Sequence, residues 1–319
     1  MSRNPFFSVV IPIYNKAPHI ARSIGSVLSQ TFKDFELIIV NDASTDGSIE
    51  EVKKFNDSCI CLLHREKPGP GGYAARNLGI KEAKGQWIAF LDADDEWYPN
   101  HLEKLYELSV KFPEIYFLGC GWQSQYNGIK KENAFVKEFN SNKTMIITTA
   151  GFLKYSLLKK QPVWTSVVCI KKTSPVASDL FPANSGAKRG GDRYAWLKMI
   201  SFHKKMAWSN HIGAIYHQDS VSMVTKISTG DHSLMKRSCY NELSKDYSNE
   251  EKKLLAKYFN QQLLSVWIEC MLKERNKFRL ISKIYWRKDI LNALLLVGLS
   301  FLPAKFWHLL NYHKKWVTD

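Results

Sequence analysis

Clustered acidic side chains stand where short apolar runs of this sequence end. Asp92, Asp94 and Asp95 follow the apolar run 87–91, and Asp42 comes just after another such run. Neighbouring carboxylates repel one another, so a cluster of them needs a counter-cation or shares a proton. Carboxylate oxygens suit Mg²⁺ or Mn²⁺, which keep open positions for phosphate oxygens. The residue types therefore indicate a divalent metal, Mn²⁺ or Mg²⁺, that bridges a diphosphate.

Helix N-termini offer a simpler explanation for part of this pattern. The helix dipole favours acids in the first turn, which would account for Asp95, and a capping role would account for Asp46. Asp92 and Asp94 both precede the expected helix, so the dipole does not account for them. We therefore take Asp42, Asp92 and Asp94 as candidate functional residues.

The apolar runs that would position these acids alternate with amphipathic segments. The runs expected as strands are 8–14, 35–40, 59–63 and 86–91, and the helices expected between them are 20–30, 48–55 and 73–83. Apolar strands separated by helices are typical of a parallel sheet that is covered on both faces. Because ligands of such α/β sheets bind beyond the carboxyl ends of the strands, the acids are expected to share one functional rim.

The composition describes a globular chain with a large positive charge. Among 319 residues, 45 Lys and Arg stand against 30 Asp and Glu, which gives a net charge of +15. The 45% of hydrophobic residues excludes a disordered or collagenous chain. The excess charge indicates an anionic partner, which could be nucleic acid, an acidic membrane surface or a phosphorylated ligand. Six cysteines without a CxxC pair and an N-terminus without a signal peptide predict a reducing, cytoplasmic location.

Five segments, in this order, make the sequence resemble the family 2 glycosyltransferases, which have the GT-A fold. They are Val9–Asn15, Val40–Asp46, Ala75–Gly79, Phe90–Asp95 and Gly190–Asp192. The resemblance implies an α/β fold with a Rossmann-like, mostly parallel central sheet flanked by helices. It also implies an inverting, metal-dependent hexosyltransferase. The Gln-x-x-Arg-Trp motif of the family's processive synthases is absent from the sequence, so we expect one sugar to be transferred per encounter.

The resemblance implies a donor site at the rim of the sheet. The residues that it places against the nucleotide and its diphosphate are Pro12, Tyr14, Asn15, Asp42, Arg76, Asn77, Asp92, Ala93 and Asp94. Asp42 would read the uracil ring of a UDP-sugar, Asp92 would approach the ribose, and Asp94 would ligate the metal. The guanidinium of Arg76 could also form bidentate bonds that hold the acidic strand end in place.

Asp192 stands where the family has its catalytic base, and the resemblance assigns it that role. The acceptor hydroxyl must lose its proton as it attacks the anomeric carbon, so a separate acid is needed there. The family often has Glu immediately before this Asp, whereas this sequence has Gly191. The alternative is that Asp192 caps the helix expected to begin near Tyr194, and one residue can do both.

His217 stands where relatives commonly carry a His or Arg near the diphosphate. The resemblance makes it a candidate third metal ligand, beside Asp94 and Asp92, or a phosphate donor. A structural or exposed histidine is the alternative.

We expect a catalytic domain over residues 1–225, with a nucleotide-sugar-binding half (1–118) and an acceptor-side half (119–225). Residues 226–319 are expected to form a helical C-terminal extension that is both basic and apolar and that serves as a membrane-interface or an acceptor-binding element. Part of it, residues 272–315, contains ten Lys or Arg and two acids, a net charge of +8.

The apolar stretch 290–302 is thirteen residues long, whereas a span of the bilayer takes about twenty. Basic residues beside apolar ones fit a helix that lies in an anionic membrane interface. The alternative is an ordinary helix that packs on the catalytic domain. No nucleic-acid-binding motif accompanies the charge, so no nucleic-acid partner is expected.

The expected function is the transfer of a sugar from a nucleotide diphosphate sugar, UDP-linked, to a hydroxyl of a glycan. A lipid-linked acceptor on the inner face of the cell membrane, as in lipopolysaccharide O-antigen or capsule synthesis, would suit the basic tail. Transfer to a polyprenyl phosphate is one alternative. A non-catalytic module that binds membrane or nucleic acid on the same scaffold is another, although the intact acids argue against it. The donor sugar, the linkage and the oligomeric state are not indicated by the sequence.

Overall fold

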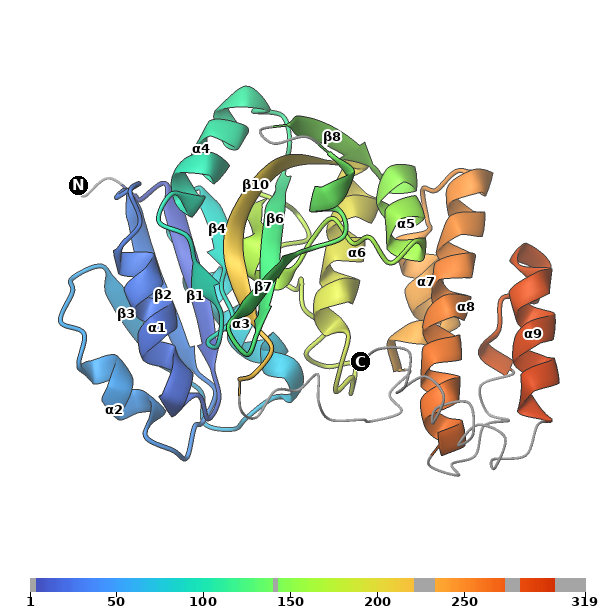
Figure 1. The fold of residues 1–319 in the computed structure, drawn as a ribbon, viewed down its shortest axis with the longest axis horizontal. Coiled ribbons are helices and arrows are strands. Elements are labelled where there is room, and N and C mark those ends of the chain that lie inside the picture. Colours follow the sequence, from blue (N-terminus) through green and yellow to red (C-terminus); the bar gives the residue numbers. More distant parts are fainter. Residues whose placement is uncertain (1–3, 140–142, 221–232, 273–281, 302–319) are drawn as a thin grey trace. The chain divides into compact units, whose positions relative to one another are not determined.

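The computed structural model describes residues 4–139, 143–220, 233–272 and 282–301 (Figure 1). The chain divides into two compact units, unit 1 (Met1–Lys226) and unit 2 (Ile227–Asp319).

Unit 1 is built around a sheet with ten strands in the described part of the chain. They are β1 (Phe7–Ile13), β2 (Phe35–Asn41), β3 (Ile60–His64), β4 (Trp87–Phe90), β5 (Glu96–Trp97), β6 (Phe117–Tyr126), β7 (Ile129–Glu132), β8 (Thr144–Thr148), β9 (Val168–Lys171) and β10 (Lys205–His217). Their order is β3-β2-β1-β4-β9-β6-β10-β5, with β7 beside β6 and β8 beside β10.

The N-terminal part of the sheet is parallel, as the sequence predicts. β1 pairs in parallel with β2 and with β4, and β2 pairs in parallel with β3. β6 and β10 are also parallel, but β9 runs antiparallel between β4 and β6. The α/β prediction is therefore confirmed, with a mixed sheet in which β9 was not foreseen.

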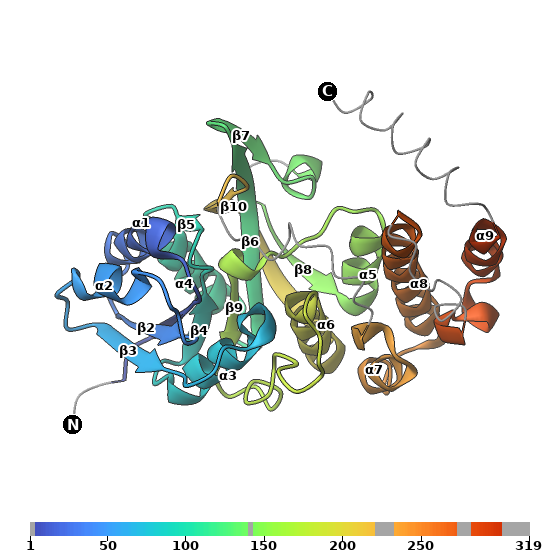
Figure 2. The same ribbon diagram turned by 90° about the horizontal axis from the view of Figure 1, so that it is seen from below.

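Helices cover both faces of this sheet, as expected of parallel strands with continuous apolar runs (Figure 2). They are α1 (Ala17–Leu28), α2 (Ser48–Lys53), α3 (Tyr73–Glu82), α4 (His101–Lys111), α5 (Thr149–Leu157) and α6 (Gly191–His203). Ile11 of β1 belongs to one buried cluster with Ile20 and Ile24 of α1. On the opposite face, Gly79 of α3 lies so close to Val10 that a Cβ there would be 2.4 Å from its Cγ1. The alternating side chains of β1 thus fix α1 and α3 on opposite faces.

Unit 2 is helical in its described part and contains α7 (Arg237–Leu243), α8 (Asn249–Leu272) and α9 (Ile290–Ser300). A small apolar core joins Leu263 and Trp267 of α8 to Ala293 of α9. The amide of Asn260 donates to Asp289 Oδ2 over 3.0 Å, so the buried carboxylate before α9 has a partner. Across the described ranges, no helix combines the length and the apolar character that a membrane span requires.

Candidate active site

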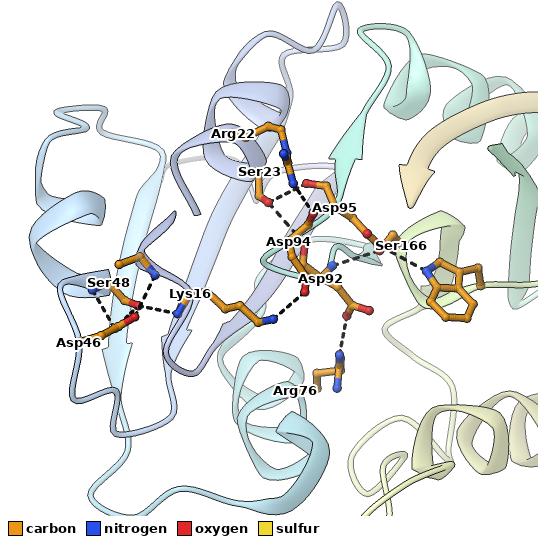
Figure 3. Close-up of polar contacts among 12 residues, drawn as sticks. Lys16, Arg22, Ser23, Asp46, Ser48, Arg76, Asp92, Asp94, Asp95 and Ser166 are labelled. Atoms are coloured by element: carbon orange, nitrogen blue, oxygen red, sulfur yellow. Dashed lines mark hydrogen bonds and ion pairs between the residues drawn. The ribbon is translucent and has the colours of Figure 1, made fainter. Parts of the chain in front are cut away.

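The strand ends of β1, β2 and β4 meet at one rim of unit 1, and the predicted acids lie there. Figure 3 shows Asp92, Asp94 and Asp95 after β4, with basic side chains directed at them from α1 and α3. The backbone N–H of Asp42 donates to Ile13 O over 2.8 Å, which places the end of β2 beside the end of β1. Parallel pairing therefore gathers these side chains, as the sequence predicts.

Asp92 forms a largely buried ion pair with Arg76 of α3. Arg76 Nη2 lies 2.5 Å from Asp92 Oδ1, and the two side chains are 9% and 23% exposed. Burial raises the pKa of Asp92, and although Arg76 opposes the shift, the negative charge of Asp94 adds to it. Arg76 also donates to Gly71 O over 2.7 Å, which joins the glycine-rich turn, residues 69–72, to the same rim. The predicted support of the acidic strand end by Arg76 is what this geometry provides.

Asp94 is paired with Lys16, which lies three residues after the end of β1. Lys16 Nζ lies 2.6 Å from Asp94 Oδ2, and both side chains are 14% exposed (Figure 3). The carbonyl of Asp94 separately accepts a hydrogen bond from Arg22 Nη2 over 2.6 Å. The backbone of Asp94 is therefore anchored by one cation and its carboxylate by another.

Asp95 points into the protein and not toward the rim. Ser166 Oγ donates to Asp95 Oδ2 over 2.5 Å, and Trp164 Nε1 donates to the same oxygen over 3.2 Å. Burial raises the pKa of Asp95 well above its usual value, and the charges of Asp94 and Asp92 add to this shift. Ser166 Oγ also accepts from the N–H of Asp92 over 3.1 Å, so Asp95 and Ser166 together brace the loop that carries the other two acids.

Asp42 is 1% exposed and is held by two donors at the end of β2. Arg65 Nη1 forms an ion pair with Asp42 Oδ1, and the N–H of Gly69 donates to Oδ2 over 3.0 Å. Both donors belong to the segment that follows β3. The base-reading position expected from the resemblance thus contains a carboxylate and a guanidinium side by side.

The three residues at the end of β1 line this part of the rim. Asn15 has a left-handed backbone (φ 51°), and its Oδ1 accepts from the N–H of Thr45 over 2.8 Å. Tyr14 is 47% exposed. A Cβ on Gly72 would lie 3.5 Å from the Cβ of Pro12, so the glycine-rich turn packs against this strand end. They are the residues that the resemblance places against the nucleoside.

Asn77 and Ala93 have packing roles in this structure. The side-chain amide of Asn77 donates to Phe181 O over 2.8 Å and accepts from Phe181 N over 3.0 Å, which joins α3 to a distant loop. Ala93 is 3% exposed, within the core below the rim.

Asp192 lies in the first turn of α6, close enough to the rim acids to interact with them. Its negative charge favours the charged form of Arg76 and raises the pKa of Asp92, in each case as a smaller cause than burial. Asp192 comes from a segment about a hundred residues after Asp92 in the sequence, so the fold and not local sequence brings the two carboxylates together.

The structure explains why Gly191 precedes Asp192. A Cβ on Gly191 would lie 2.4 Å from Tyr73 Cζ, because the tyrosine ring fills the space beside it. The N–H of Gly191 donates to the Tyr73 hydroxyl over 2.9 Å. Tyr73 begins α3, the helix that carries Arg76, so this contact sets the start of α6 against the rim.

His217 ends β10 and is 5% exposed. Its Nε2 lies 3.1 Å from Glu96 Oε2, and burial, with a further contribution from Arg22, lowers its pKa. In the part of the chain that the structure describes, no three His, Cys, Asp or Glu side chains are grouped so that they could hold a metal. His217 therefore does not join Asp92 and Asp94 in one preformed group.

Four residues of the site were not anticipated: Lys16, Arg22, Arg65 and Ser166. Arg65 directly follows β3, and this place at a strand end is the sequence signal that identifies it. Lys16 lies three residues after β1, where a lysine is a weaker signal of a metal or nucleotide site than an acid or an amide. Arg22 and Ser166 lie in a helix and a turn without a motif, and only the fold brings them to the rim.

Comparisons with known proteins show what this chain is similar to. Residues 8–159 match the family model described as Glycosyl transferase family 2. WfgD of Escherichia coli, a UDP-Glc:α-D-GlcNAc-diphosphoundecaprenol β-1,3-glucosyltransferase, is 42% identical over 104 residues, which make up 33% of this chain and 41% of WfgD. This chain spans less than half of the length of WfgD and of the Rickettsia glycosyltransferases that it also resembles.

Two solved structures share the fold. S. aureus TarS in complex with UDP-GlcNAc has a TM-score of 0.70 at 19% identity, over 89% of this chain and 83% of that one. The mannosyltransferase PcManGT from Pyrobaculum calidifontis, in complex with GDP-Man and Mn²⁺, has a TM-score of 0.52 at 17% identity, over 100% and 82%. At such identities the likeness shows the fold alone. Because the family model, the order of the motifs and the GT-A fold agree, residues 8–159 of this chain belong to glycosyltransferase family 2.

Proposed function

We propose that this chain transfers one sugar from a nucleotide diphosphate sugar to a hydroxyl of a glycan, with inversion at the anomeric carbon. The observation that carries the proposal is the placement of Asp192: the hydrogen bond from Gly191 N to the Tyr73 hydroxyl, over 2.9 Å, joins the start of its helix to the helix that carries Arg76. A donor-binding rim and a separate carboxylate beside it are what a single displacement requires.

The donor is proposed to be UDP-linked. Asp42 Oδ1 and Arg65 Nη1 place an acceptor and a donor next to each other, which suits the N–H and the carbonyl on one edge of uracil. WfgD is named for a UDP-Glc donor, and the TarS structure contains UDP-GlcNAc. PcManGT contains GDP-Man, so GDP-sugars are the alternative donors to be tested beside UDP-sugars.

The metal is proposed to be Mn²⁺ or Mg²⁺, held by Asp94 and Asp92. Both are hard oxygen donors whose side chains keep some exposure at the rim, 14% and 23%, so the donor set fits such an ion. PcManGT, with the same fold, contains Mn²⁺. The described residues alone supply too few grouped ligands, so diphosphate oxygens would have to complete the shell. When bound, the ion would neutralise charge on the departing diphosphate.

Asp192 is proposed to be the general base. Its carboxylate would accept the proton of the acceptor hydroxyl as that oxygen forms a bond to the anomeric carbon. The bond from the anomeric carbon to the diphosphate oxygen breaks in the same step, and the nucleoside diphosphate leaves. The hydrogen bond of Gly191 N to the Tyr73 hydroxyl would hold the start of α6, and so Asp192, on the side of the rim where the acceptor must arrive.

The acceptor is proposed to be lipid-linked, in the synthesis of a cell-surface polysaccharide such as O-antigen or capsule. WfgD is named for an acceptor of this kind, a GlcNAc-diphosphoundecaprenol. Transfer to a polyprenyl phosphate would use the same donor site, so only the structure of the product distinguishes the two reactions.

Unit 2 is proposed to hold the enzyme at the inner face of an anionic membrane. On α9, Leu291, Leu294 and Leu295 are 83%, 57% and 48% exposed, and they share one side of the helix by their spacing. The sequence around α9 carries the net charge of +8 between residues 272 and 315. Apolar side chains that reach the acyl boundary beside basic ones that meet anionic headgroups fit a lipid surface.

The experiment that tests the proposed reaction is a donor screen. The full chain would be incubated with UDP- and GDP-sugars, with and without Mn²⁺, and release of the nucleoside diphosphate measured. Metal-stimulated release from a UDP-sugar that increases when a GlcNAc-diphospholipid is added is the expected result. No release from any donor under any condition would contradict the proposal.

A further inference from the structure

We infer that Lys16 occupies the metal position of Asp94 until the nucleotide arrives, so that the divalent cation binds with the donor and not before it. The inference rests on the proposed donor and metal site and adds an order of binding to it. Lys16 is a residue that no sequence motif of the site includes.

The ion pair itself is the first observation. Lys16 Nζ lies 2.6 Å from Asp94 Oδ2, and each side chain is only 14% exposed (Figure 3). The ammonium of Lys16 neutralises the carboxylate and puts a positive charge beside the oxygen that a metal ion would bind. A divalent cation that enters the site without a diphosphate is therefore repelled by Lys16 and gains less from Asp94.

The second observation is that the backbone of Lys16 is held independently of its side chain. The N–H of Lys16 donates to Ser48 Oγ over 2.8 Å, and Ser48 Oγ is in turn hydrogen-bonded to Asp46 Oδ1 over 2.5 Å. Asp46 also accepts from the N–H of Ala17 over 3.1 Å. The flexible four-carbon stem of the lysine can therefore swing from Asp94 to a neighbouring anion without a change in the strand end.

The third observation is that Asp94 does not depend on Lys16 for its position. Its carbonyl is held by Arg22 Nη2 over 2.6 Å, and the next peptide is held by Ser23 Oγ, which donates to Asp95 O over 2.6 Å. Removal of the lysine side chain should leave the carboxylate where it is and available to a metal ion. If Lys16 only held Asp94 in position, removal of its side chain would instead weaken metal binding.

The arrival of a diphosphate supplies a second anion for the lysine. Its oxygens carry more negative charge than one carboxylate and lie, by the proposed function, beside Asp94. Lys16 would then bind the diphosphate while the metal takes its place on Asp94, so the total charge of the site changes little. Lys16 is in this way a diphosphate-binding residue as well as the cation that keeps the empty site closed to metal.

The test is a pair of binding titrations on the full chain with Lys16→Met, Lys16→Arg and Asp94→Asn. Free Mn²⁺ is measured by electron paramagnetic resonance, without nucleotide and with UDP, and UDP binding is measured by calorimetry in the presence of chelator. The matched control is Lys54→Met, which removes a 65% exposed lysine paired with Glu51 over 2.6 Å. Circular dichroism establishes that each variant is folded.

Lys16→Met should bind Mn²⁺ without nucleotide roughly tenfold more tightly than the unaltered chain and should bind metal-free UDP roughly tenfold more weakly. Lys16→Arg and Lys54→Met should change neither affinity by more than about twofold. Unchanged or weaker Mn²⁺ binding by Lys16→Met, while the unaltered chain binds Mn²⁺ with UDP, would overturn the inference and leave the proposed function standing. If neither chain binds Mn²⁺ with UDP, both the inference and the proposed metal site are wrong.

Discussion

The two units of this chain differ in their polar and apolar side chains: unit 1 gathers paired charges at its rim, and unit 2 exposes apolar side chains. In unit 1, three rim aspartates each have a basic partner: Asp42 with Arg65, Asp92 with Arg76 and Asp94 with Lys16. In unit 2, the described part of α9 leaves large apolar side chains exposed, up to 83% at Leu291. The paired charges balance one another in a partly buried rim, whereas the exposed leucines of α9 can contact an external apolar surface. The charged rim and the exposed apolar face thus belong to different units, so each can be altered separately.

The largest effect is expected for Asp192→Asn, which tests whether the chemistry of unit 1 depends on this carboxylate. The amide cannot accept the proton, so turnover with donor and acceptor should fall by about 10²- to 10⁴-fold. Binding of UDP and of anionic vesicles should stay within about twofold of the unaltered chain, since the substitution changes neither surface. Nucleoside diphosphate release and co-sedimentation are the measurements, and Asp179→Asn, at an exposed site of unit 1, is the control. Equal turnover of Asp192→Asn and the control would show that Asp192 is not the base.

Arg76→Met tests whether the rim charges of unit 1 must be paired. It leaves Asp92 without its cation, and because Asp92 keeps 23% exposure, we expect a loss of about 2–3 kcal/mol in the free energy of unfolding, at the low end for a buried pair. Urea denaturation of the full chain provides the measurement. Lys104→Met, which breaks an exposed pair with Glu107 at 2.8 Å, should cost less than about 0.5 kcal/mol. Similar losses in both variants would mean that the rim pairs are ordinary surface pairs.

Leu291→Glu combined with Leu294→Glu tests the apolar face of unit 2. Two leucines that no longer enter the lipid should weaken binding to vesicles with anionic headgroups by at least about tenfold. Thermal stability and turnover with a soluble acceptor should be unaltered, because both side chains are already exposed. The control places glutamates at Val110 and Leu158, which are 60% and 64% exposed in unit 1. Loss of vesicle binding in the control but not in the α9 variant would reverse the comparison.

The smallest effect is expected for His203 of unit 1, which should make the free energy of unfolding depend on pH. Burial lowers the pKa of His203 to about 4, and its Nε2 lies 2.8 Å from Ser174 Oγ. The unfolded chain binds a proton at His203 more readily than the folded chain does. The free energy of unfolding is therefore unaffected by this histidine well above pH 6.5, and it decreases as the pH falls from there toward 4. Between pH 6.5 and 5 the unaltered chain should lose about 1 kcal/mol more than His203→Gln in urea denaturation. Equal losses in the two chains would contradict this assignment.

The sequence is sufficient to predict the elements that are locally encoded. The strands β1, β2 and β4 and the helix α3 lie within a residue or two of their predicted positions, because apolar runs and turn residues mark them directly. The rim acids follow from the same strand ends. β9, in contrast, is a four-residue strand, Val168–Lys171, whose antiparallel place between β4 and β6 depends on pairing with distant segments.

The partners of the acids could not be predicted in the same way. The hydrogen bond from Ser166 to Asp95 joins residues far apart in the sequence, and no local sequence pattern predicts it. Lys16 is one of 45 Lys and Arg residues, and only the fold selects it as the cation of Asp94. The sequence predicts a helical extension over residues 226–319 but not its division, in which α7 ends at Leu243 and α8 begins at Asn249.

The central claim is that unit 1 transfers one sugar with Asp192 as the base, and the mass of the acceptor tests it most directly. The full chain would be incubated with a UDP-sugar, Mn²⁺ and a synthetic GlcNAc-diphospholipid, and the lipid analysed by mass spectrometry beside an Asp192→Asn reaction. We predict a product heavier by a single sugar residue, formed at most at a hundredth of the rate by the variant. An unmodified lipid with every donor tried, or equal product from both proteins, would contradict the account.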